Sequence, residues 1–315
     1  MNDSYQQWHE RLVDGLSVLP DKPEETPAST LYALWHAAAG APCSAAAAAA
    51  RGELPALDDL GRQTLDRLVI RRLAGEPLAH ITGRQRFMGL EMLSGPQALI
   101  PRVETEQLAS ACIELLQNPQ HTSSARVIDV CTGSGNLAFA IAHHVPHAEV
   151  FGADLSEEAV AFAERNGHHL GLQSRVRFRV GDLLAPFETH DFLGRVDLIV
   201  SNPPYIASSR LGQADLIVCA PPYIRSSKVE QMAGEIADHE PRLAFDGGPF
   251  GVSILMRLVE DAPKFLRAGA WLALEVGLGQ GAALVKRLQR NDAYQEIRAL
   301  DDDNGDIRVI LARRA

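Results

Sequence analysis

The stretch Arg126-Val-Ile-Asp-Val-Cys-Thr-Gly-Ser-Gly-Asn136 joins a short apolar run to a glycine turn and then to a helix-forming segment. Residues 126–130 have the β-branched, apolar character of a buried strand, and residues 136–145 (NLAFAIAHHV) have a helical composition. Gly133 and Gly135 between them allow the backbone to turn tightly and to approach a ligand closely. The stretch therefore predicts a strand, a glycine turn and a helix, which is the first unit of an α/β fold.

The same alternation continues downstream of this unit. Further strand-like runs lie at residues 148–156, 175–184, 196–205, 270–277 and 306–314, and helical segments separate them except between the runs 175–184 and 196–205. Repeated βα units imply a mostly parallel sheet with helices on both faces.

The N-terminal part of the chain lacks this alternation. Residues 30–51 are Ala-rich with apolar residues at helical spacing, and residues 57–77 repeat that spacing before Pro77. We therefore predict a helical N-terminal domain over residues 1–85, a hairpin hinge over residues 86–101, and an α/β domain over residues 102–315.

Composition and charge exclude several functional classes. The chain has 315 residues, 46% of them hydrophobic, and a formal net charge of −10, which argues against non-specific nucleic-acid binding. Its 4 cysteines form no CxxC pair, so we expect no metal site and reduced thiols, as in the cytoplasm. No run approaches the roughly 20 apolar residues of a membrane helix, and no signal peptide is evident.

An aspartate stands near the end of each of the first three predicted strands. Asp129 is placed to meet a cationic amine, Asp154 to bind a ribose diol, and Asp182 to receive an adenine amino group. The turn lacks the GxGxxG spacing of dinucleotide binders. The pattern thus fits S-adenosylmethionine (SAM) better than NAD or ATP. The alternative is that each aspartate merely caps a helix.

Neighbouring residues complete the predicted cofactor site. Arg102 is expected to pair with the SAM carboxylate, or alternatively with a surface acid. Asn136 either reaches the cofactor or caps the helix that it begins. The remaining members lie in the glycine turn or beside the acids: Thr132, Gly133, Gly135, Leu155 and Leu183.

One segment of the chain occurs twice in similar form. Residues 197–211 read DLIVSNPPYIASSRL and residues 215–229 read DLIVCAPPYIRSSKV. Each copy predicts a buried strand that stops at Pro-Pro, because proline removes a backbone donor. The first copy carries Asn202 before the prolines, whereas the second carries Ala220. Which copy forms the active site stays open, and the first is slightly favoured.

These motifs together resemble a known family. DVCTGSG, ADLS, GDLL and DLIVSNPPYI, in this order, resemble class I SAM-dependent methyltransferases of the HemK type, the protein-glutamine N5-methyltransferases. GEPLAHITGRQRFMGLEM, LIPRVETEQL and HEPRLAFDGG are similar to that family's hinge, linker and post-motif loop. The resemblance implies a Rossmann-like seven-stranded methyltransferase sheet with a small N-terminal helical domain, SAM as cofactor, and a release factor as the protein substrate.

The NPPY motif suits the chemistry of a weakly nucleophilic amide nitrogen. The side-chain oxygen of Asn202 and the carbonyl of Pro203 can accept the two N–H groups of a carboxamide and align it for attack on a methyl group. Tyr205, or Tyr223 of the second copy, can pack on the substrate or face the sulfonium. Ala220 has no side-chain acceptor, so the two copies cannot do the same work.

Two alternatives remain open from the sequence. One is a small-molecule SAM enzyme, either a methyltransferase or an intramolecular cyclase that gives azetidine-2-carboxylate and methylthioadenosine. The other is a SAM-binding module without catalysis. In every case we expect no direct nucleic-acid binding and no membrane association.

Overall fold

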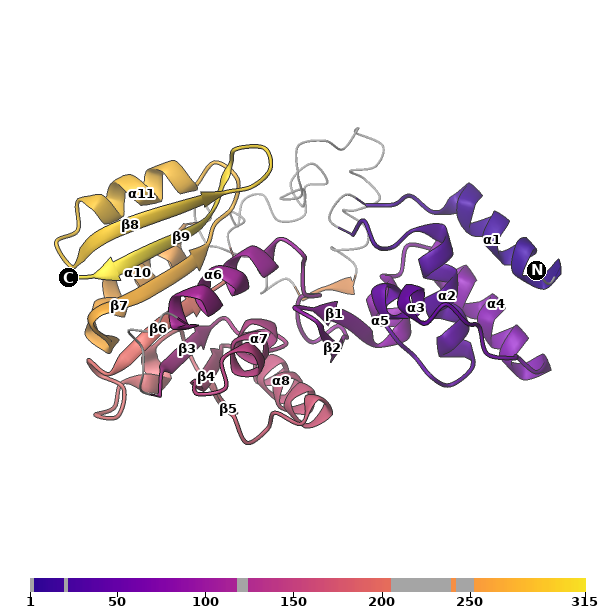
Figure 1. The fold of residues 1–315 in the computed structure, drawn as a ribbon, viewed down its shortest axis with the longest axis horizontal. Helices are drawn as coiled ribbons and strands as arrows, with labels where there is room; N and C mark the ends of the chain where they lie inside the picture. Colours follow the sequence, from indigo (N-terminus) through magenta and orange to yellow (C-terminus); the bar gives the residue numbers. More distant parts are fainter. Residues whose placement is uncertain (1–2, 20–21, 118–123, 205–238, 242–251) are drawn as a thin grey trace. The chain divides into compact units, whose positions relative to one another are not determined.

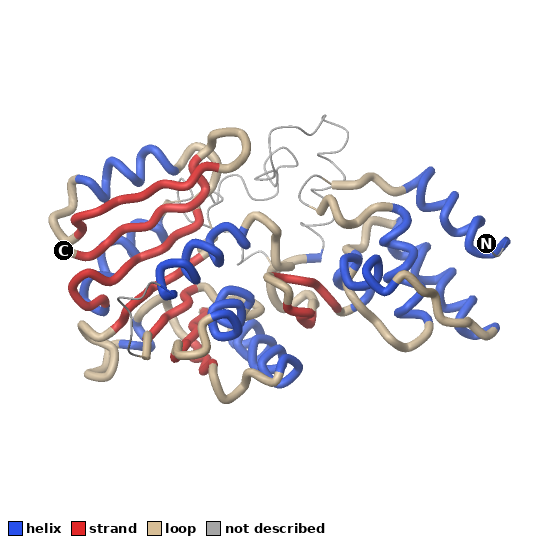
Figure 2. The backbone as a smooth tube through the Cα atoms, viewed as in Figure 1, coloured by secondary structure: helices blue, strands red, loops and turns tan. Residues whose placement is uncertain are grey.

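The computed structural model describes residues 3–19, 22–117, 124–204, 239–241 and 252–315. Its described residues fall into two compact units. The first comprises residues 3–103 with 239–241, and the second comprises residues 104–204 with 252–315 (Figures 1 and 2). The three-part division expected from the sequence stays a prediction.

The first unit is mainly helical. Thr26, Ser44 and Asp58 each accept the backbone N–H three residues ahead, which satisfies a donor that a helix start would otherwise leave free. The Ala-rich segment forms two helices, because Gly40 (φ 78°) and Pro42 interrupt it. The helices are α1 Asp3–Gly15, α2 Pro27–Ala38, α3 Ala45–Arg51, α4 Asp59–Leu73 and α5 Leu78–Thr82.

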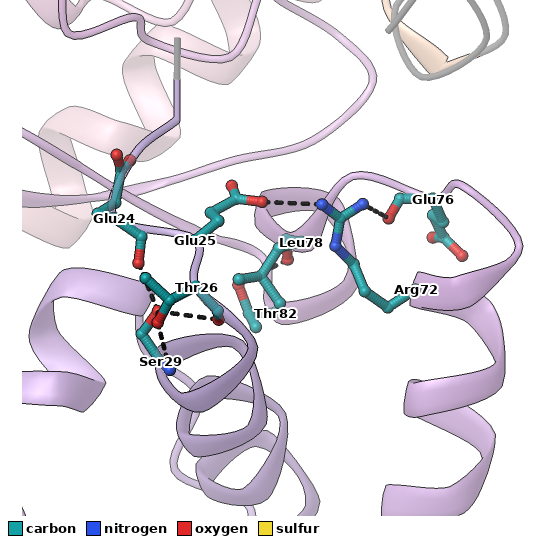
Figure 3. A network of polar contacts seen from close by, with 8 residues as sticks. All are labelled: Glu24, Glu25, Thr26, Ser29, Arg72, Glu76, Leu78 and Thr82. Carbon is teal, nitrogen blue, oxygen red and sulfur yellow. Dashed lines mark hydrogen bonds and ion pairs between the residues drawn. The ribbon is translucent and has the colours of Figure 1, made fainter. Parts of the chain in front are cut away.

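A buried ion pair fixes the loop that precedes α2. Arg72 of α4 contacts Glu25 at 3.1 Å, and both side chains are almost completely buried. The Arg72 guanidinium also donates to the carbonyl of Glu76 (3.1 Å), and Figure 3 shows Arg72 reaching both partners. Breaking such a pair leaves an uncompensated buried charge, at a typical cost of about 3–5 kcal/mol. Glu25 belongs to a Pro- and Glu-rich segment with the composition of a loop, and this ion pair makes the segment part of the buried interior of the unit.

A hairpin is formed by β1 (Arg84–Phe87) and β2 (Leu90–Leu93), which pair antiparallel, and it begins two residues before the predicted hinge of residues 86–101. Met88 (φ 48°) and Gly89 (φ 83°) form the two-residue turn between them, and positive φ at both positions matches the right-handed twist of a hairpin. Glu91 accepts hydrogen bonds from the backbone N–H and the hydroxyl of Ser44. These bonds tie the hairpin to the start of α3.

The second unit contains the seven-stranded sheet that the resemblance implies. Its strand order is β5-β4-β3-β6-β7-β9-β8. The β5-β4-β3-β6-β7 part is parallel, and β9 is antiparallel to both of its neighbours. The α/β prediction is confirmed. The strands are β3 Arg126–Val130, β4 Glu149–Asp154, β5 Val176–Val180, β6 Val196–Ser201, β7 Leu266–Glu275, β8 Tyr294–Asp301 and β9 Ile307–Arg314.

Helices cover both faces of this sheet. Apolar residues of α10 and α11 pack with Phe187 and the strand residues Ile128 and Ile199 in one buried cluster. Figure 1 shows α6, α7 and α8 in front of the strands and α10 behind them. Among the helices that the structure describes, none is long and apolar enough to cross a membrane. They are α6 Thr105–Gln117, α7 Asn136–His144, α8 Glu157–Leu170, α10 Ser253–Phe265 and α11 Gly281–Gln289, with a 3-10 turn η1 at Ala185–Phe187.

Strand β8 is the one strand of this sheet that the sequence patterns did not reveal. It lies at the sheet edge, and most of its side chains are partly or fully exposed, so its sequence YQEIRALD has no apolar run. The acidic segment after it forms the hairpin turn to β9. Asp302 accepts the backbone N–H groups of Asn304 and Asp306, and Gly305 adopts φ 81°.

Candidate functional site

The parallel strands bring the predicted site residues to one edge of the sheet. Asp129 on β3 is in register with Gly152 of β4 and Val200 of β6, and Ser201 is in register with Leu274 of β7. The carboxyl ends of four neighbouring strands therefore meet at this edge. In open α/β sheets, ligands bind there.

The glycine turn after β3 has the conformation that the sequence predicts. Gly133 (φ 54°) and Gly135 (φ 81°) are both left-handed, and Cys131 (φ 59°) adopts the same strained region without being glycine. A Cβ atom at Gly135 would lie 2.6 Å from the ring of Phe139, so a larger residue does not fit. Asn136 is the first residue of α7, and its side chain is half-buried. The turn thus holds backbone and side-chain polar groups against the end of β3.

Asp129 lies completely buried beneath this turn. Its Oδ2 accepts from the Thr132 hydroxyl (2.6 Å) and from the backbone N–H of Ala138 (3.2 Å). Its Oδ1 has no hydrogen-bond partner among the described residues. Burial raises the pKa of Asp129 to about 7, and the nearby Asp154 adds to the rise. Among the residues that the structure describes, no cationic side chain is paired with this carboxyl group.

Asp154 ends β4 and borders the same turn. Its carboxylate accepts the backbone N–H groups of Gly133 and Ser156, each at 2.9 Å. Burial nevertheless raises its pKa. The next residue, Leu155, is 57% exposed, which leaves an apolar side chain open beside a carboxylate. Such a pairing of an acceptor with an apolar surface suits a ribose and its attached base.

Two other charged residues that were predicted to contact the cofactor, Asp182 and Arg102, form ion pairs within their own units. Asp182 forms a bidentate pair with Arg257 of α10 at 3.1 and 2.7 Å, and both side chains are about half exposed. Leu183 beside it is buried, with φ 50°. Arg102 pairs with Glu240 in the first unit. Their roles toward the cofactor stay predictions.

The turn and its acids fit SAM. Two buried polar atoms here, Asp129 Oδ1 and Ser134 Oγ, have no hydrogen-bond partner among the described residues. A buried carboxyl group without a positive partner favours a cationic ligand, because an opposite charge stabilises its ionised form. SAM carries both an ammonium and a sulfonium group. Asp129, Asp154 and the turn residues Thr132, Gly133 and Gly135 are the groups that would hold it.

The first copy of the doubled segment forms the central strand of the sheet. Its DLIV run belongs to β6, which is buried throughout and lies between β3 and β7. Asn202 follows directly, and its Nδ2 donates to the hydroxyl of Thr105 (3.1 Å). Pro203 is buried. Tyr205 and the whole second copy, including Ala220 and Tyr223, lie outside the described residues.

Three residues around Asn202 were not predicted as part of the site. Thr105 begins α6, Glu275 ends β7, and Arg308 lies on β9, and all three are buried. Thr105 lowers the pKa of Glu275 as a nearby hydrogen-bond donor does, and an Arg308 nitrogen lies 4.0 Å from a Glu275 oxygen. Burial raises the pKa of Glu275 to about 7. These residues are far apart in the chain, so no local pattern links them.

Comparisons with known proteins agree with this geometry. A family model described as a methyltransferase domain matches residues 121–243. A release factor glutamine methyltransferase of Moorella thermoacetica is 38% identical over 78% of this chain and 77% of its own length. One from Geobacter sulfurreducens is 37% identical over 78% and 76%. The N-terminal domain of human METTL16, solved with S-adenosylhomocysteine (SAH), shares the fold (TM-score 0.50, 17% identity, 77% of this chain and 82% of that one).

Proposed function

The chain belongs to the release factor glutamine methyltransferase family and is a SAM-dependent methyltransferase, and from this premise we propose that it methylates a glutamine side-chain amide in a release factor. The observation that carries the proposal is the position of Asn202, which directly follows the central strand β6 at the edge where Asp129 and Asp154 lie. Bound SAM supplies an electrophilic methyl group carried on sulfur.

Asn202 and Pro203 can compensate for the weak nucleophilicity of the substrate amide nitrogen. A carboxamide nitrogen is a poor nucleophile, because its lone pair is delocalised into the carbonyl. Two fixed acceptors, the Asn202 side-chain oxygen and the Pro203 carbonyl, would hold its N–H groups and orient the nitrogen toward the methyl group. Positioning of this kind can supply several kcal/mol of the barrier reduction, so no strong base is required.

We assign this role to the first copy of the doubled segment. Its apolar run belongs to a strand that is hydrogen-bonded on both sides, so the position of Asn202 is set by the sheet itself. Ala220 of the second copy has no side-chain oxygen with which to accept an amide N–H. Tyr205 stays the predicted aromatic neighbour of the substrate.

The relatives do not favour the cyclase or small-molecule alternatives, since they are named as methyltransferases that act on a protein. We further propose that the protein works in the cytoplasm. The free thiols of Cys43, Cys112 and Cys131 are compatible with a reducing compartment.

The test is a methylation assay with two variants. We expect the purified chain to transfer one labelled methyl group from SAM to a full-length bacterial release factor, at a glutamine that tandem mass spectrometry locates. We expect Asn202→Ala to lower kcat by at least ~100-fold, in the range seen when a group that positions the reacting atoms is lost. Its Kd for SAH should stay within about twofold of the wild-type value, since the cofactor groups are on other strands.

Two controls separate the outcomes. A release factor whose located glutamine is replaced by glutamate should accept no methyl group. Methylthioadenosine formed from SAM without any acceptor, or an unmethylated release factor, would contradict the proposed function. Normal activity of a folded Asn202→Ala variant would instead contradict only the assignment of the first copy.

A further inference from the structure

We infer that Thr105 and Glu275 are positioning residues that fix the side-chain orientation of Asn202, so that its oxygen and not its NH2 group is presented to the substrate amide. The inference rests on the proposed function, which assigns Asn202 as the acceptor. It adds two residues to which the proposed function gives no role. All the residues involved belong to the second unit.

The first step is the meeting of three elements at one point. Ser201 of β6 is in register with Leu274 of β7, so the following residues, Asn202 and Glu275, leave neighbouring parallel strands at the same edge. Thr105 is the first residue of α6; its hydroxyl accepts a hydrogen bond from Asn202, and it lowers the pKa of Glu275 as a nearby donor does. Thr105 is 1% exposed and Glu275 is 3% exposed, so water does not compete effectively for these bonds.

The second step is a count of protons. A threonine hydroxyl has a single proton to donate, and an ionised carboxylate can only accept. Thr105 therefore gives its proton to Glu275 and is left to accept a hydrogen bond from Asn202. The atom of Asn202 that can donate is Nδ2, which lies 3.1 Å from the Thr105 oxygen. Asn202 Oδ1 is thereby turned away from Thr105 and left to accept an N–H from a substrate.

The third step is the anchor behind Glu275. Arg308 donates from Nε to the carbonyl of Val276 (3.2 Å), and its own carbonyl accepts the Val276 N–H (2.9 Å). These bonds hold its guanidinium 4.0 Å from the Glu275 carboxylate. The positive charge favours the ionised form of Glu275, which is the form that accepts the Thr105 proton. The opposing charge is Glu104, which directly precedes Thr105.

The orientation matters because the two ends of an asparagine side chain have opposite hydrogen-bonding character. An NH2 group facing the substrate would meet the N–H groups of the glutamine amide, and two donors repel each other. Without Thr105, the amide of Asn202 can rotate by 180° at little cost. In the rotated orientation its NH2 group faces the substrate N–H groups, and a buried donor left unpaired in this way costs as much as a lost hydrogen bond.

The experiment compares Thr105→Val with Thr105→Ser. Valine keeps the shape and removes the hydroxyl, whereas serine keeps the hydroxyl. We expect Thr105→Val to lower kcat for release-factor methylation at least tenfold, with the Kd for SAH within twofold of wild type, and Thr105→Ser to recover kcat to within threefold. In a background of Asn202→Ala, Thr105→Val should cause no further loss, because its effect passes through Asn202.

Tyr294→Phe serves as a matched control. It also removes a buried hydroxyl from the second unit, one that donates to the carbonyl of Val259 (2.8 Å). We expect its kcat to stay within twofold of wild type. If Thr105→Val is folded and its kcat matches this control, or if Thr105→Ser is as impaired as Thr105→Val, the inference is wrong.

A second readout does not depend on activity. The chain has seven asparagines, so selective ¹⁵N-asparagine labelling gives seven side-chain NH2 pairs. We expect the pair that disappears in Asn202→Ala to exchange slowly with solvent in the wild type and in Thr105→Ser, and at least tenfold faster in Thr105→Val. Equal exchange in all three would overturn the inference, even if the wild type methylated no release factor.

Discussion

Asp129 and Glu275 are two buried carboxyl groups that the protein holds in different ways. Both are buried, burial raises the pKa of each to about 7, and each keeps one oxygen without a hydrogen-bond partner among the described residues. The hydrogen bonds of Asp129 are local, and they come from Thr132 of the following turn and from Ala138 of α7. Glu275 depends on Thr105 and Arg308, which are distant in the chain. One carboxyl group belongs to a sequence motif, and the other belongs to a tertiary contact.

This difference assigns the two groups to different steps of the reaction. Asp129 lies under the glycine turn, where a cationic cofactor would supply the positive charge that it lacks. Glu275 lies behind Asn202, where its charge sets the direction of a hydrogen bond. We therefore expect changes at Asp129 to act on cofactor affinity and changes at Glu275 to act on kcat.

Of the changes at these two carboxyl groups, the largest expected effect on the reaction is that of Asp129→Asn. The asparagine oxygen can still accept from Thr132 and Ala138, so the turn is kept while the negative charge is lost. A hydrogen bond to a charged group is worth on the order of 2 kcal/mol, which corresponds to a Kd for SAM raised about 30-fold at pH 8. Titration calorimetry would measure this change. An unaltered Kd would show that Asp129 only shapes the turn.

Glu275→Gln should lower kcat and leave the Kd for SAM unchanged, the opposite of what is expected for Asp129→Asn. An amide is a weaker acceptor for the Thr105 proton than a carboxylate, and we expect kcat to fall about 3- to 10-fold with the Kd for SAM unchanged. In the wild type, protonation of Glu275 likewise replaces a carboxylate by a weaker, neutral acceptor, so kcat should fall as the pH drops through about 7. The variant should lack this acidic limb. If the pH profile of kcat is the same in both proteins, the ionisation of Glu275 has no effect on the reaction.

A third expected effect is on stability and not on the reaction. The pKa of Glu275 is raised from 4.5 to about 7 in the folded chain, so between these values the folded state binds more protons than the unfolded state. The free energy of unfolding should therefore fall as the pH rises from 4.5 to 7, and Asp129 contributes in the same direction. Glu275→Gln should remove on the order of 3 kcal/mol of this dependence.

Chemical denaturation at pH 5 and pH 8 would measure the effect, with Asp129→Asn as the companion variant. Glu275→Gln should be more stable than the wild type at pH 8 and nearly equal to it at pH 5. A variant that is less stable at both values would mean that the charge of Glu275 helps to hold the fold together. The two carboxyl groups would then differ in their effect on stability as well as in function.

Much of the fold follows from patterns between neighbouring residues. The apolar runs of β3 and β6, the glycine turn and the start of α7 are local features, and the structure has them where the sequence predicts them. Strand β8 was missed, because an exposed edge strand does not need an apolar run. The loop before α2 carries Glu25 into a buried ion pair, which its Pro- and Glu-rich composition does not reveal.

The sequence by itself determined the α/β class, the glycine turn over Asp129 and the place of Asn202 after a buried strand. It could do so because periodicity, positive φ at glycine and strand-ending prolines are properties of adjacent residues. Only the tertiary structure decided that Thr105, Glu275 and Arg308 stand behind Asn202. Strand order and register bring those residues together across about 200 positions of the chain, and no spacing in the sequence encodes that meeting.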